Sequence, residues 1–236
     1  MFKILSIIIY FIWCPFFLLT GLIVLLIAFL YKPIVYPVIR IMAYMNLYFL
    51  GAIPKVSGRR PTETPYIIMY NHSSFIDIFF LPIIAPGPFT GIVAEKNMKI
   101  PVFSWILKKF EAIPIQRSNK SNALNGIEQA EKVLSTGISV GILPEGSRTL
   151  DGKMLPLKKG GFHMALNSKC NILPVGINGA FSYKPKNRWF LIPRMIKINI
   201  GTPINTSCFN IDNLDDFIMT VEKKIKELSG EYNEIK

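Results

Sequence analysis

The chain has 236 residues, half of them hydrophobic, and carries a formal net charge of +12 from 27 lysines and arginines against 15 acidic residues. This length allows one sizeable core together with a membrane segment. Because neither a zinc-ligand cluster nor an aromatic-basic RNA motif accompanies the basic charge, the composition favours an anionic membrane surface over nucleic acid as partner. The cysteines, Cys14, Cys170 and Cys208, do not form a disulfide framework, which indicates a reducing compartment for the soluble part.

The N-terminal residues form the most apolar part of the chain. No charged residue occurs between Ile4 and Leu30, and this run exceeds the roughly 20 residues that span a bilayer. Pro15 interrupts the run, so the pattern fits either a kinked span or a hairpin that lies in one leaflet. A cleaved signal peptide is disfavoured, because the run is long for its apolar region and no A-x-A site follows. We therefore expect an N-terminal membrane anchor.

A second apolar stretch runs from Ile41 to Pro54. It is short for a span and predicts an interfacial or re-entrant helix, or a core helix of the domain that follows. Residues 1–55 are accordingly predicted to be membrane-anchoring helices, and residues 56–236 to be a globular domain. Lysines flank both ends of the first apolar run, so charge does not determine its orientation, but a reducing compartment would place the globular domain on the cytoplasmic face.

Beyond residue 56, short apolar runs alternate with helical patterns. The predicted strands are apolar or alternate in polarity: Tyr66–Tyr70, Ile92–Ala94, Ala112–Gln116, Ile138–Leu143, Ile172–Ile177 and Ile196–Ile200. The predicted helices are Asn122–Leu134, Gly161–Lys169 and Leu214–Leu228. This alternation predicts an α/β fold, with a mixed, largely parallel sheet that is flanked by helices.

The segment from Asn71 to Asp77 directly follows the first predicted strand. Ser74 and Asp77 resemble a capping box, which predicts a helix start and leaves His72 at the N-terminal mouth of that helix. From the first turn, Asp77 can orient the imidazole and stabilise its protonated form, as a general base requires. A helix cap with an incidental histidine explains the same residues equally well.

Charged residues also follow other predicted strands. After the strand Ile138–Leu143 and a proline come Glu145, Gly146, Ser147 and Arg148. In an open α/β sheet ligands bind at the carboxyl ends of strands, so these residues are candidates for substrate binding. Arg117 ends another predicted strand, and its guanidinium suits bidentate phosphate binding. Taken singly, a surface ion pair in a turn and a solvated arginine are the simpler explanations.

Three further residues carry weaker patterns. Ser139 fits the G-x-S-x-G nucleophile elbow, but it lies inside an apolar strand that no helix follows, so a serine hydrolase is disfavoured. Cys170 lies at a predicted helix-to-strand junction and is interpreted as structural rather than nucleophilic. Pro174, in an extended apolar segment, by itself indicates only a strand near an edge or a bulge.

Taken in order, these motifs resemble the glycerolipid acyltransferase family, and within it the enzymes that acylate lysophosphatidate. The N-H-x-x-x-x-D motif runs from Asn71 to Asp77, and the E-G-[ST]-R motif from Glu145 to Arg148. The arginine of the second family motif falls on Arg117, and the proline motif on Pro174. The resemblance covers roughly residues 56–203. The chain departs from the family at Glu111, where the family often has glycine.

The resemblance implies that His72 takes the proton from the acceptor hydroxyl as it attacks an acyl thioester, while Asp77 orients His72. The substrate-binding residues that it implies are Asn71, Arg117, Glu145, Gly146, Ser147, Arg148 and Pro174. The implied reaction uses lysophosphatidate and acyl-acyl carrier protein or acyl-coenzyme A, and gives phosphatidate for phospholipid biosynthesis. It involves anionic membrane lipids, and no metal or other cofactor.

Two other functions remain open at this point. A sister acyltransferase would use another lysolipid as acceptor, such as a different lysophospholipid or a lyso-ornithine lipid. A noncatalytic lipid-binding membrane protein would have no need of the histidine and carboxylate. The presence of both His72 and Asp77 argues against that second alternative.

Overall fold

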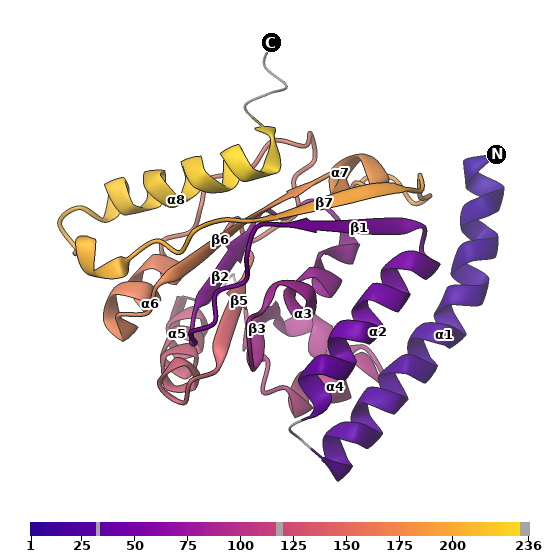
Figure 1. The fold of residues 1–236 in the computed structure, drawn as a ribbon, viewed down its shortest axis with the longest axis horizontal. Coiled ribbons are helices and arrows are strands. Elements are labelled where there is room, and N and C mark those ends of the chain that lie inside the picture. The colour runs from indigo at the N-terminus through magenta and orange to yellow at the C-terminus, as the bar shows by residue number, and fades with distance from the viewer. Residues whose placement is uncertain (32–33, 117–119, 232–236) are drawn as a thin grey trace.

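The computed structural model describes residues 1–31, 34–116 and 120–231. These residues include a seven-stranded sheet with helices packed around it (Figure 1). The strands stand in the order β1-β7-β6-β2-β5-β3-β4. Neighbouring strands run parallel, except that β6 and β7 are antiparallel. Their bounds are β1 Ala52–Ser57, β2 Ile67–Tyr70, β3 Phe89–Ala94, β4 Ile113–Ile115, β5 Ser139–Ile142, β6 Ile172–Asn178 and β7 Arg194–Ile200. The mixed, largely parallel sheet that the sequence predicts is confirmed.

Helices cover both faces of this sheet (Figure 1). The α-helices are α1 Phe2–Leu30, α2 Val35–Phe49, α3 Phe80–Ile84, α4 Phe103–Lys109, α5 Lys120–Ser135, α6 Gly160–Ser168, α7 Ala180–Tyr183 and α8 Leu214–Ser229. Short 3-10 helices cover Phe75–Phe79, Glu95–Lys99 and Thr206–Cys208. All of the strands and helices predicted beyond residue 56 are present, with ends that differ by a few residues.

Strand β2 lies at the centre of the sheet and contributes to two separate cores. Ile68 and Tyr70 pack with residues of α2, α3 and α7 on one face. Ile67 and Met69 pack with residues of α5, α6 and α8 on the other. Because successive side chains of a strand point to opposite faces, a continuous apolar strand of this kind requires helices on both sides. The carboxyl end of β2 is thereby held rigidly between the two layers.

The first apolar run forms a single helix, α1, which continues through Pro15. The hairpin interpretation requires the chain to fold back at the proline, and α1 does not do so. In the described part of the chain, α1 is the one helix long and apolar enough to cross a bilayer, and most of its apolar stretch lies uncovered. Phe11 and Phe29, for example, are 82% and 81% exposed. This composition suits association with a membrane.

Polar contacts also attach α1 to the rest of the molecule. Trp13 Nε1 donates to Asn46 Oδ1 of α2 at 3.0 Å, and Asn46 Nδ2 donates to Thr20 Oγ1 at 3.2 Å. Near the N-terminus of α1, Ser6 Oγ accepts from the backbone N–H of Leu191 at 2.8 Å. Buried polar groups of this kind hold a helix in one register, because breaking them leaves unpaired donors. The anchor helix is thus fixed in orientation relative to the sheet.

The second apolar stretch contains two elements rather than one. Helix α2 ends at Phe49 and strand β1 begins at Ala52, before the boundary at residue 56 that hydropathy indicated. Leu47 and Leu50 are fully buried in the same core as β2, so α2 is a core helix of the domain. Pro54 lies in β1, an edge strand, where a missing backbone donor is tolerated. Hydropathy alone does not separate buried sheet residues from a membrane helix.

Candidate active site

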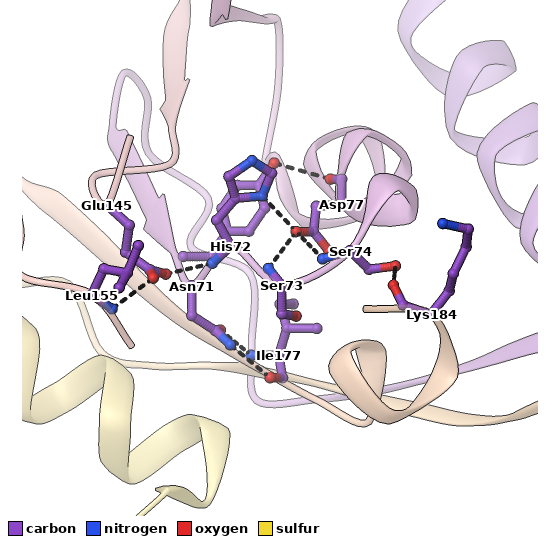
Figure 2. Close-up of polar contacts among 10 residues, drawn as sticks. Asn71, His72, Ser73, Ser74, Asp77, Glu145, Leu155, Ile177 and Lys184 are labelled. Atoms are coloured by element: carbon purple, nitrogen blue, oxygen red, sulfur yellow. Dashed lines mark hydrogen bonds and ion pairs between the residues drawn. The ribbon is translucent and has the colours of Figure 1, made fainter. Parts of the chain in front are cut away.

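His72 and Asp77 meet at the carboxyl end of β2, as Figure 2 shows. The chain leaves β2 at Tyr70, turns, and enters the 3-10 helix Phe75–Phe79 with Ser74 as its N-cap. Asp77 lies in the first turn of that helix, and its Oδ2 is 2.7 Å from His72 Nδ1. The predicted capping box and the predicted contact between carboxylate and imidazole are both present. An incidental histidine would have no reason to point at this carboxylate.

The hydrogen bonds of Asp77 determine which nitrogen of His72 carries the hydrogen. Asp77 Oδ2 also accepts from the backbone N–H groups of Ser73 at 2.8 Å and Ser74 at 3.0 Å. An oxygen that accepts from two N–H donors acts as an acceptor toward the imidazole too, so Nδ1 is the donor in that contact. Nε2 is then the basic nitrogen. The His72 side chain remains 17% exposed, whereas Asp77 is fully buried.

Asn71 connects this turn to strand β6. Its Nδ2 donates to the carbonyl of Ile177 at 2.9 Å, and its Oδ1 accepts from the N–H of Ile177 at 2.7 Å (Figure 2). Both polar atoms of the amide are therefore engaged with one backbone residue. These contacts fix the position of the residue next to His72, and the predicted contact of Asn71 with substrate stays a prediction.

Glu145 also faces the backbone of the His72 turn. Its Oε1 accepts from the N–H of His72 at 2.6 Å, and its Oε2 accepts from the N–H of Leu155 at 2.8 Å (Figure 2). The carbonyl of His72 accepts in turn from the N–H of Thr149 at 3.0 Å. The loop after β5 thus holds both backbone groups of His72. Sequence patterns did not identify Leu155 or Thr149, because these contacts involve only their backbone atoms.

Burial has a clear effect on the Glu145 carboxyl. The residue is only 3% exposed, and desolvation raises its pKa from 4.5 to about 7, although the two backbone N–H donors oppose the shift. Glu145 was predicted to contact the acceptor. Because its oxygens accept from the backbone N–H groups of His72 and Leu155, Glu145 positions the His72 turn, and its contact with the acceptor stays a prediction.

A pocket of about 630 Å³ opens beside Glu145. Gly146 and Ser147 line it, and Gly146 has a φ of +76°, a conformation that favours glycine. The apolar lining comes from the sheet, the loop after β5 and the helices α5 and α6: Ile92, Ile115, Ile127, Ile142, Leu143, Leu155 and Met164. The predicted residues Gly146 and Ser147 thus border a space that suits a hydrocarbon chain.

Arg148 and Pro174 are the other predicted site residues in the described part of the chain. Arg148 continues the loop between Glu145 and Thr149 and is partly exposed. Pro174 lies buried in the middle of β6, where it is paired with Met69, and it does not line the pocket beside Glu145. Arg117 lies outside the described residues.

The two alternative nucleophiles are both enclosed. Ser139 is fully buried in β5, and its Oγ accepts from the N–H of Tyr66 at 3.1 Å, so it does not form an exposed elbow. Cys170 is buried, and desolvation raises the pKa of its thiol to about 11, which disfavours the reactive thiolate. The structural interpretation of both residues is confirmed.

Comparison with known proteins gives concordant results. Residues 53–178 match the family model described as Acyltransferase. The chain is 30% identical over 176 residues to a 1-acyl-sn-glycerol-3-phosphate acyltransferase of Limnanthes douglasii, which covers 74% of this chain and 63% of that protein. It is 32% identical over 186 residues to a protein of the same name from Saccharomyces cerevisiae, covering 75% and 59%. The chain thus spans less than two thirds of the length of these relatives.

The fold also has a counterpart among solved structures. The crystal structure of the 1-acyl-sn-glycerophosphate (LPA) acyltransferase PlsC from Thermotoga maritima superposes with a TM-score of 0.84. The match covers 99% of this chain and 98% of that one, at 24% identity. It therefore includes the N-terminal helices as well as the sheet.

Proposed function

The chain belongs to the acyltransferase family, and on this premise we propose that it transfers a fatty acyl group from an acyl thioester to the sn-2 hydroxyl of 1-acyl-glycerol-3-phosphate. The product is phosphatidate, and the thiol of coenzyme A or of acyl carrier protein is released. The names of the plant and yeast relatives support this acceptor. The reaction requires no group beyond the acyl thioester.

The observation that carries the proposal is the 2.7 Å contact between His72 Nδ1 and Asp77 Oδ2. It leaves Nε2 free to take the proton of the acceptor hydroxyl as the oxygen attacks the thioester carbonyl. When the C–S bond breaks, the leaving sulfur takes that proton from Nε2, so the histidine returns to its starting state. The buried charge of Asp77 stabilises the imidazolium that forms between these steps.

The pocket beside Glu145 supports an acyl substrate. Its volume of about 630 Å³ and its lining of isoleucine, leucine and methionine side chains suit a hydrocarbon chain. Gly146 and Ser147, which line it, belong to the loop that holds the His72 backbone. An acyl chain bound there would lie beside the loop that positions His72.

The exposed apolar surface of α1 supports a membrane site for the reaction, because both lipid substrate and lipid product reside in a bilayer. The net charge of +12 adds attraction to anionic lipids. Donor thioesters of coenzyme A and acyl carrier protein are cytoplasmic, so the catalytic domain is proposed to lie on the cytoplasmic face.

An acceptor panel tests the proposal. The purified full-length chain in detergent is given lysophosphatidate, lysophosphatidylcholine or monoacylglycerol, each with acyl-coenzyme A and with acyl-acyl carrier protein. Phosphatidate formation well above the other products is expected with at least one donor. Preferential acylation of another lysolipid would replace the proposed acceptor, and transfer to none of them would refute the activity.

A further inference from the structure

The loop of residues 149–155 contacts the His72 turn at both of its ends. At its start, the backbone N–H of Thr149 donates to the carbonyl of His72 at 3.0 Å. At its end, the N–H of Leu155 donates to Glu145 Oε2 at 2.8 Å, and the other oxygen of that carboxylate accepts from the N–H of His72 at 2.6 Å (Figure 2). The path of this loop therefore determines where both backbone groups of His72 are held.

Local hydrogen bonds fix the first part of this loop, and a distant carboxylate holds its last part. Thr149 Oγ1 donates to Asp151 Oδ1 at 2.9 Å, and the same carboxylate oxygen accepts from the N–H of Lys153 at 3.0 Å. The N–H of Met154, the next residue, donates instead to Glu231, 3.3 Å from Oε1 and 3.2 Å from Oε2. Glu231 is thus bound to the backbone immediately before the N–H group that Glu145 holds.

The position of Glu231 is set by the end of α8, which is attached to the sheet. Asn178 Nδ2 of β6 donates to the carbonyl of Ser229 at 2.8 Å, and Asn199 Nδ2 of β7 donates to the carbonyl of Leu228 at 2.6 Å. Carbonyls in the last turn of a helix have no partner within the helix, so these side chains satisfy them and fix the helix end. Glu231 follows two residues after Ser229 and extends to the loop from this fixed point.

We infer that Glu231 is a positioning residue for the acyl transfer, which acts from the end of α8 through the backbone of Met154 and Leu155 on the Glu145 carboxylate. The inference rests on the proposed function. Because the two N–H groups are consecutive, holding the first restricts where the second can point. A misplacement of about 1 Å in an active site can lower the rate about 10²-fold. Glu231 does not line the pocket beside Glu145, so its loss should lower kcat rather than substrate affinity.

The test compares Glu231→Ala and Glu231→Gln with the matched control Glu227→Ala in the full-length chain, with folding checked by circular dichroism. Glu227 is an exposed carboxylate one turn earlier, on α8. The kcat of Glu231→Ala should fall roughly 10- to 100-fold, with the KM for lysophosphatidate close to wild type. Glu231→Gln should restore most of kcat, because its amide oxygen still accepts from the N–H of Met154. Both constants of Glu227→Ala should match wild type.

A spectroscopic measurement separates this inference from the proposed activity. Because the chain has only two histidines, NMR can follow the His72 imidazole with His163 as the reference. The His72 resonance should move in Glu231→Ala and return toward its wild-type position in Glu231→Gln. If the chain acylates lysophosphatidate but folded Glu231→Ala keeps the wild-type kcat, or Glu227→Ala loses as much, the inference is wrong and the activity stands. If the wild-type chain acylates no lysolipid, the activity fails, and an unchanged His72 resonance in Glu231→Ala would overturn the inference too.

Discussion

Replacing Glu145 by glutamine should remove a pH dependence of folding stability that the buried carboxyl creates. Burial raises the pKa of this group to about 7 in the folded chain, from an ordinary 4.5. Between these values the folded state keeps a proton that the unfolded chain has released. The stability from this group is therefore complete below pH 4.5 and is lost as the pH rises through about 7. The shift corresponds to about 3 kcal/mol.

The assay is the free energy of unfolding by urea in detergent, measured at pH 5 and pH 8. Between these two values wild type should lose about 2–3 kcal/mol more than Glu145→Gln. Glu227→Gln removes an exposed carboxylate from α8 and serves as the control, which should follow wild type. Identical pH dependence in wild type and Glu145→Gln would refute the reasoning.

Further substitutions test individual contacts. Asp77→Asn should lower kcat by about 10²- to 10⁴-fold with little change in the KM of the acceptor, because the imidazole loses its orienting charge; an unchanged kcat would contradict this role. Ser139→Ala should keep kcat and lose about 1–3 kcal/mol of stability, since the N–H of Tyr66 loses its acceptor. A folded but inactive variant would support the interpretation of Ser139 as a nucleophile. Asn46→Leu should cost about 1–3 kcal/mol in unfolding experiments by leaving Trp13 Nε1 unpaired, and unchanged stability would show that this contact does not hold α1.

The sequence predicts the sheet and the contact between His72 and Asp77 because both depend on local patterns. Continuous apolar runs such as Ile67–Tyr70 identify strands that are buried on both faces. The pairing of His72 with Asp77 follows from a cap motif, whose geometry is set within a single turn.

The roles of Asn71 and Glu145 were harder to predict, because they depend on contacts between distant segments. Each side chain binds backbone atoms of another strand or loop, and backbone donors are the same for every residue type. The place of Pro174 in a family motif predicts a site residue, and the structure shows only that it is buried inside β6. Membership of a motif does not distinguish residues that contact substrate from those that shape the sheet.

Glu111 shows how the structure explains a departure from the family pattern. It has a φ of +53°, in the left-handed region where glycine carries no steric cost. A glycine at this position therefore has a conformational reason, independent of substrate binding. The boundary at residue 56 that hydropathy indicates falls inside β1, because the apolar run Ile41–Pro54 continues from α2 into this strand.

The chain has only two histidines, and this allows a direct test of the central claim. The measurement is the rate of phosphatidate formation from lysophosphatidate and an acyl thioester by wild type, His72→Ala and His163→Ala, with folding checked by circular dichroism. His163 lies on α6 and serves as the matched control. His72→Ala should lose about 10²- to 10⁴-fold in rate, while His163→Ala stays near wild type. Near-normal transfer by folded His72→Ala would contradict the assignment of His72 as the base.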